Sequence, residues 1–223
     1  MRMPNMRKIT SVQYKDKSDY KVHHIKEHAQ INLDYQLDFG DDKSKVKYVK
    51  QIERLIRTSL EYKSLIKFLR EEIDMTYCSY FQNVNSNMKG VKIEIHHAPF
   101  NLFELTSIVM NRFFEEENDL NPFAIAEETM RIHFEGMVGL IPLADTVHEI
   151  VHADEPKIHV PIHFVYGDIV TFYETYHTFL SDDHKQKLAN CLAVSEEAQQ
   201  VPDVLQRNFQ YLDVSGMELP DLK

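Results

Sequence analysis

Hydrophobic residues recur at helical spacing from residue 43 to about residue 74, between lysines, arginines and acidic residues. This spacing predicts an amphipathic helix, and Thr58-Ser59 is a point at which it would divide into two helices. Such a stripe is more typical of a core or an interaction surface than of a catalytic site. Its members are Val46, Val49, Ile52, Ile56, Leu60, Leu65 and Leu69.

Alternating apolar and polar residues predict strands on either side of that helix. Residues 32–39 alternate ahead of it, and residues 77–82 and 91–95 follow it. The turn-rich residues 83–90 would join the last two strands into a hairpin. The second strand of this hairpin runs directly into the pair His96-His97.

Two further helices are predicted between residues 98 and 137. Asn101 with Glu104 is a cap for the first, whose apolar positions recur at helical spacing. Asn121-Pro122 opens the second, because proline is favoured in the first helical position, and Gly136 closes it.

The short apolar run at residues 139–143 predicts another strand, which leads directly into a helix at residues 144–152. Thr146 with Glu149 is a capping-box pattern for that helix. His148 and His152 are one turn apart and share a face. Val147, Ile150 and Val151 fall on the other side, toward a core.

The remaining pattern predicts a strand at residues 158–165, a helix at residues 169–180 and a last helix from Ser181 to about Gln199. The tail from Val201 carries Pro202, Gly216 and Pro220. The fold class expected from all these elements is α+β. Three regions are expected: a mostly helical region at 1–75, a central domain at 76–180, and a C-terminal helix and tail at 181–223.

Histidines at the end of one strand and on the helix after another strand predict a metal site supplied by two elements. Imidazole nitrogens can hold a divalent ion without filling all of its positions, which leaves room for a phosphate or a water. They suit zinc or nickel better than magnesium, although manganese and magnesium remain candidates for the one divalent ion expected here.

This layout resembles the HNH (ββα-metal) nuclease family, including phage-encoded members, and its HxxxH detail resembles the colicin-type DNases. The resemblance covers residues 91–99 and 138–152. It implies a ββα-metal core with a helical insert at 98–137, and metal-dependent hydrolysis of DNA phosphodiester bonds. It also implies that His97 is the general base, that His96 and His148 bind the metal, and that His152 is a further candidate ligand.

Two features depart from the family's pattern. Gly139 stands where the namesake Asn, which orients the base, usually precedes the second strand. Residues 98–137 also separate the two halves, where compact members have a short loop. A catalytically degenerate nuclease fold, kept as a binding or structural module, is therefore the second hypothesis.

A third hypothesis uses the same helix. His148-Glu149-Ile150-Val151-His152 also reads H-E-x-x-H, the zinc-protease motif in which Glu is the general base. The third ligand would then be His163, Glu174 or His177. This interpretation leaves His96-His97 unexplained. A fourth is that these histidines merely cap and pack.

The formal net charge of −10 opposes loose binding to nucleic acid, so any DNA contact needs a local basic surface. A partner protein that delivers the nucleic acid would also resolve this conflict. An ordinary solvated helix face is the alternative interpretation of the basic residues. The residues expected to make the contact are Lys43, Lys45, Lys47, Lys50, Arg54 and Arg57.

The amino-acid composition excludes several classes of protein and of binding site. No apolar run approaches the length of a membrane span, and the start of the sequence lacks a secretory signal. Cys78 and Cys191 are too few for a disulfide framework or a cysteine zinc knuckle, which also excludes the HNH subclass with a structural zinc. No glycine-rich phosphate loop is present. The expected location is the cytoplasm, or the host cytoplasm for a phage-encoded protein.

Overall fold

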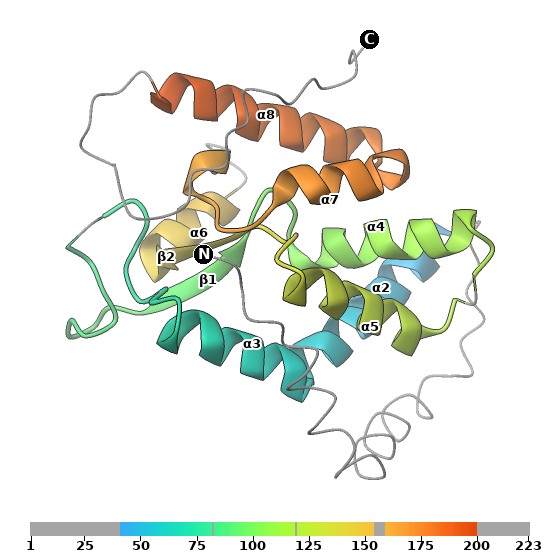
Figure 1. Cartoon of the computed structure of the whole chain (residues 1–223), viewed down its shortest axis with the longest axis horizontal. Helices are drawn as coiled ribbons and strands as arrows, with labels where there is room; N and C mark the ends of the chain where they lie inside the picture. The colour runs from blue at the N-terminus through green and yellow to red at the C-terminus, as the bar shows by residue number, and fades with distance from the viewer. Residues whose placement is uncertain (1–40, 82, 119, 154–158, 200–223) are drawn as a thin grey trace.

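The computed structural model describes residues 41–199, except 82, 119 and 154–158. Within these residues the protein is mainly helical, with one two-stranded antiparallel sheet (Figure 1). This mixture of helices and one small sheet is compatible with the predicted α+β class. The strand predicted at 32–39 and the tail from Val201 lie outside the described residues.

The first helical stretch divides as predicted. Helix α2 spans Asp42–Thr58 and helix α3 spans Leu60–Glu71. Ser59 ends α2 in an extended conformation, and its hydroxyl accepts a hydrogen bond from the Tyr62 backbone N–H, which starts α3. The predicted apolar stripe is buried except at its edges, where Val46 and Leu60 are exposed.

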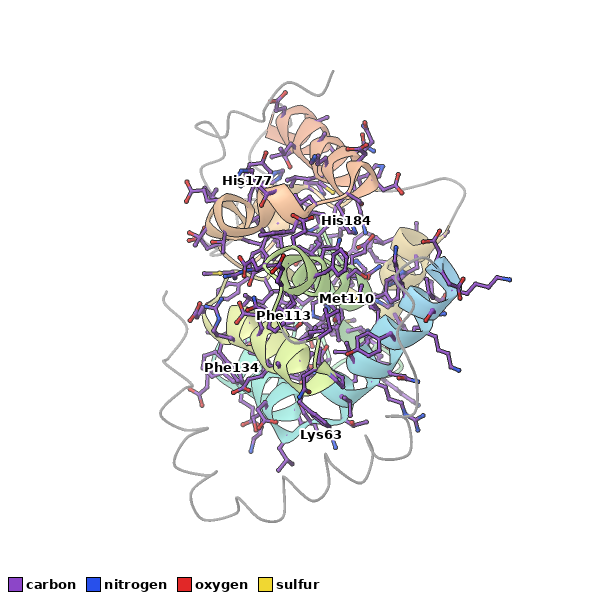
Figure 2. The ribbon with its side chains drawn as sticks, turned by 90° about the vertical axis from the view of Figure 1, so that its right-hand side faces the viewer. Lys63, Met110, Phe113, Phe134, His177 and His184 are labelled. Atoms are coloured by element: carbon purple, nitrogen blue, oxygen red, sulfur yellow. The ribbon has the colours of Figure 1, made fainter. Side chains whose placement is uncertain are left out.

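Both helices predicted between residues 98 and 137 are confirmed, as α4 (Leu102–Glu115) and α5 (Pro122–Phe134). The α4 cap is reciprocal, because the Asn101 side chain accepts from the Glu104 N–H at 2.9 Å and the Glu104 carboxylate accepts from the Asn101 N–H at 2.7 Å. Helix α4 packs against α2, α5 and α7 (Ile169–Tyr176). Figure 2 shows α4, marked by Met110 and Phe113, between α5 and the C-terminal helices.

The sheet joins two segments that are far apart in the chain. Strand β1 (Ile93–His97) pairs antiparallel with β2 (Leu140–Ala144), so that His97 lies opposite Leu140. Strand β2 leads without a loop into α6 (Asp145–His152), which packs on both strands. Helices α4 and α5 are therefore inserted between the paired strands.

The predicted hairpin is wrong, because β1 pairs with β2 and the described residues 77–81 form no strand. Tyr77 instead makes an isolated antiparallel bridge with Asn85. The Ser79 N–H does donate to the Pro142 carbonyl of β2 at 2.9 Å. Pro142 has no N–H to return, so the ladder cannot extend along this edge of β2.

The capping box predicted for α6 is also wrong. The helix begins at Asp145 with Ala144 as its N-cap, and no side chain caps it. Ala144 still belongs to β2, so the end of the strand sets the start of the helix ahead of Thr146. Val147 and Val151 pack toward the core as expected, whereas Ile150 is 43% exposed.

After α6, the two predicted helices are present but the predicted strand is not. Residues 162–164 form a 3-10 turn, η1 (Ile162–Phe164), in place of the predicted strand, and Tyr166 alone pairs with Leu140. Helix α7 continues into η2 (His177–Phe179), and α8 spans Asp182–Gln199.

Buried side chains from all three predicted regions join one hydrophobic core, with contributions from α2, α4, β2, α7 and α8. Val49, Leu105, Leu143, Phe172 and Leu188 are examples. The division at residues 75 and 180 stays a prediction.

Candidate metal centre

Three of the histidines singled out from the sequence lie together. His96 projects from β1, and His148 and His152 project from α6, with one ring nitrogen of each within 4.8 Å of the others. The ring centroids are 4.5–5.1 Å apart and each pair of rings is inclined at 76–77°. Among the described residues, this is the group of three or more such side chains whose geometry fits a metal ion.

The elements that carry the three histidines explain why their side chains meet. His148 and His152 are four residues apart and lie on one face of α6, with their Nε2 atoms 3.1 Å apart. Because α6 follows β2 directly, it packs back on the sheet, and His96 meets that face from β1. His96 is 9% exposed and forms the inner member of the group, whereas His152 is at the surface.

Burial keeps two of the three imidazoles, His96 and His148, in the form that binds metal. It lowers the pKa of His96 to about 3, with smaller contributions from the neighbouring His152 and His148. Burial and His152 also lower the pKa of His148. Both rings are neutral at neutral pH, so a metal ion would not have to displace a proton from them.

Glu94 is a polar partner of the cluster that the sequence analysis missed. One carboxylate oxygen, Oε2, lies 2.9 Å from Nδ1 of His148, and the other accepts a hydrogen bond from Lys92. That hydrogen bond is the main reason why the pKa of Glu94 is lowered. The available signal was strand alternation, because Glu94 is two residues before His96 and shares its face of β1.

His97 does not join the cluster. Adjacent residues of a strand point to opposite faces, and His97 points into the helical side of the molecule. Its Nε2 lies 3.1 Å from Nε2 of His133 on α5, and its ring stacks on Tyr62 with centroids 6.3 Å apart. Burial holds the pKa of His97 well below its usual value. Its role as general base stays a prediction, which this position disfavours.

Gly139, where the HNH pattern would place an Asn, leaves no room for a side chain. A Cβ atom on Gly139 would lie 1.9 Å from the Ala98 carbonyl oxygen and 2.5 Å from Cγ1 of Val165. The Ala98 N–H donates to the Gly139 carbonyl at 3.0 Å, so the two backbones are in direct contact. Glycine is therefore required by the close approach of β1 and β2.

A family model for the bacteriophage G278-like virion protein matches residues 1–216. The chain belongs to this family. The match confirms the phage association expected from the sequence and lends no support to membership of a nuclease family. No curated protein and no solved structure matches the chain.

In this G278-like protein the third histidine beside His148 and His152 comes from β1. The downstream candidates of the H-E-x-x-H hypothesis, which were His163, Glu174 and His177, are not part of the group. His163 is buried beside Phe164, with ring centroids 4.6 Å apart. The arrangement therefore follows the strand–strand–helix pattern more closely than the protease pattern.

The predicted basic surface of the G278-like protein lies on α2. Lys43, Lys47, Lys50, Arg54 and Arg57 follow each other at intervals of four and three residues and are all exposed on one face. Within the helix, Lys45 pairs with Asp42 at 3.6 Å and Arg57 pairs with Glu53 at 2.8 Å. A nucleic-acid contact here stays a prediction.

None of the helices that the structure describes combines the length and apolar character needed to cross a membrane.

Proposed function

We propose that the β1–β2–α6 unit is a ββα-metal core that binds one divalent ion and hydrolyses phosphodiester bonds in DNA. The observation that carries this proposal is the convergence of His96, His148 and His152, with their ligand nitrogens within 4.8 Å. These side chains come from the first strand and from the helix that follows the second strand, as the resemblance to HNH nucleases requires.

The chemistry of the three ligands indicates the class of ion. Neutral imidazole nitrogens favour zinc, nickel or a similar ion, whereas magnesium prefers oxygen ligands. Three protein ligands leave at least one position open for water or a phosphate oxygen. A bound ion of this class would polarise the phosphate and lower the pKa of a bound water.

Water activation in this proposal comes from the ion rather than from His97. The ring of His97 is 6% exposed and is in contact with His133, so it would have to leave this pocket to accept a proton at the cluster. In a folded His97→Gln protein we therefore expect nicking to persist. Loss of nicking in that variant, with metal binding retained, would instead assign the role of general base to His97.

A metal-binding structural module is the second candidate function. It is favoured by the closed space at Gly139, by the buried position of His97 and by the net charge of −10. In this case the ion would stabilise the sheet and α6 without turnover. Membership of a virion-protein family fits a place in the phage particle for either function.

Plasmid nicking separates the two functions. We expect the full chain to nick supercoiled DNA with zinc, nickel or manganese, and His148→Ala to reduce the rate at least about 100-fold, because a metal ligand is removed. Glu149→Gln is the matched control on the same helix and should cleave like the wild type. Metal binding without cleavage would favour the structural module. No metal binding by the folded wild type would reject both functions.

Metal binding should also stabilise the fold, whichever function holds. An ion at about one hundred times its Kd adds about 2.7 kcal/mol to the free energy of unfolding. For a chain of this size that is a rise in Tm of roughly 5–10 °C. Thermal unfolding with and without zinc measures it. The rise should disappear in His152→Ala and persist in His177→Ala, which changes an exposed histidine outside the cluster. A His152→Ala protein that responds like the wild type would contradict this ligand set.

A further inference from the structure

We propose that Glu94 is a positioning residue that fixes His148 in the tautomer able to bind metal. This inference rests on the proposed metal site and deepens it. It assigns a function to a side chain on β1 that is neither a ligand nor a candidate base. The observation behind it is the 2.9 Å contact between Oε2 of Glu94 and Nδ1 of His148.

The strand places ligand and positioning residue together. Glu94 and His96 are two residues apart in β1, so both point to the sheet face on which α6 packs. Glu94 lies opposite Leu143 of β2, two residues from the start of α6. One strand therefore supplies both the ligand His96 and the carboxylate that reaches His148.

The hydrogen bonds determine where the proton of His148 lies. Lys92 donates to Oε1 of Glu94, and the other carboxylate oxygen, Oε2, is the acceptor facing Nδ1 of His148 at 2.9 Å. Nδ1 of His148 is therefore the donor in this contact and must carry a proton. The Nε2 of this ring is then left with a lone pair, which faces Nε2 of His152 at 3.1 Å. This is the side of the ring on which the ligand nitrogens gather.

The charge of Glu94 matters as well as its geometry. All three ligands are imidazoles, which carry no negative charge, so a bound divalent ion would bring two positive charges that no ligand offsets. A carboxylate on the far nitrogen of a ligand makes the imidazole more basic and limits the rotation of its ring. Glu94 and His148 are both about one-quarter exposed, at 28% and 25%, so water does not fully screen the pair.

Zinc affinity of the full chain, measured by competition with a chromophoric chelator, tests this role. Glu94→Gln keeps the shape of the side chain and removes its charge, and we expect it to weaken zinc binding about 10- to 100-fold. Glu149→Gln removes one charge from α6 without touching the His148 ring, and should change the affinity by less than about threefold because that charge is exposed and screened. Glu94→Asp, which keeps the charge, should recover part of the affinity.

A spectroscopic readout separates positioning from a general loss of structure. Two-bond proton–nitrogen correlation spectra of the metal-free protein report which ring nitrogen carries the proton. We expect the Nδ1–H form for His148 in the wild type and a mixture, or the Nε2–H form, in Glu94→Gln. Equal zinc affinity or an unchanged tautomer in Glu94→Gln would overturn this role while leaving the metal site intact. A folded wild type that binds no zinc would overturn the proposed function itself.

Discussion

Replacing Gly139 with asparagine, the residue that the resemblance to HNH nucleases would place there, should disrupt the sheet rather than create a nuclease motif. Any side chain begins with a Cβ atom, which here would lie 1.9 Å from the Ala98 carbonyl oxygen. The obstructing atom belongs to the backbone, so no rotamer change relieves the clash. The paired strands would have to separate, and with them His96 would move away from α6.

We expect Gly139→Ala to cost at least about 3 kcal/mol of unfolding free energy, the upper end for inserting atoms into a packed interior. The Tm should fall by roughly 6–12 °C. Gly90→Ala is the control, because Gly90 has a φ of +82° but nothing within 4 Å of its Cβ position. Only the backbone conformation penalises that change, by about 1–2 kcal/mol. A Gly139→Ala protein that melts like the wild type would contradict the close approach, and a stable, more active Gly139→Asn would support the nuclease motif instead.

The second large effect is loss of stability in acid, which arises from the buried His97–His133 pair. Nδ1 of His133 donates to the Thr129 carbonyl at 2.6 Å, and burial lowers the pKa of His133 to about 4. The unfolded chain takes up the proton near pH 6.5, whereas the folded chain resists it. Stability is therefore complete above pH 6.5 and is lost progressively as the pH falls toward 4.

The size of this effect follows from the shift in the pKa of His133, because each unit of pKa shift changes the free energy of unfolding by about 1.4 kcal/mol. His133 alone should remove about 3 kcal/mol between pH 6.5 and pH 4, and the lowered pKa of His97 adds to the loss. Urea unfolding at several pH values, with a chelator present to keep metal off His96, measures the slope. Because the lowered pKa of His96 contributes to the same pH dependence, His133→Gln should make the loss of stability per pH unit smaller without removing it, whereas His177→Gln, on the surface, should leave it as in the wild type. The same slope in wild type and His133→Gln would exclude a buried neutral His133.

Local signals explain which parts of the fold were predictable. Ser59, Asn101 with Glu104, and Asn121-Pro122 each act within one turn of their own helix, so the sequence contains all the information required. By contrast, the strands predicted at 158–165 and 77–82 could form only by hydrogen bonding to a neighbouring strand, and a local pattern does not specify that neighbour. Ser79 bonds to β2 and not to β1, at Pro142, which has no N–H with which to continue a ladder. Tyr166 makes one isolated bridge to Leu140, and the residues before it form the 3-10 turn η1.

In the candidate site, too, some features follow from local sequence spacing and others depend on packing between distant parts of the chain. The i, i+4 spacing of His148 and His152 guarantees a shared face on any helix, and this part of the prediction is robust. For His96-His97, alternation requires that the two rings point apart. Which of them meets α6 depends on the face of the sheet that α6 covers, and that is decided by packing between distant parts of the chain. The contact between Glu94 and His148 depends on the same packing.

The insertion of α4 and α5 between β1 and β2 has a consequence for the order of folding. The two strands are separated by residues 98–139, so their pairing closes a long loop and is slow unless the loop is first shortened. Packing of α4 against α5 shortens this loop, so we expect the two helices to form before the sheet does. The metal ligands His96 and His148 lie on opposite sides of this loop. A metal ion would consequently slow unfolding much more than it accelerates refolding.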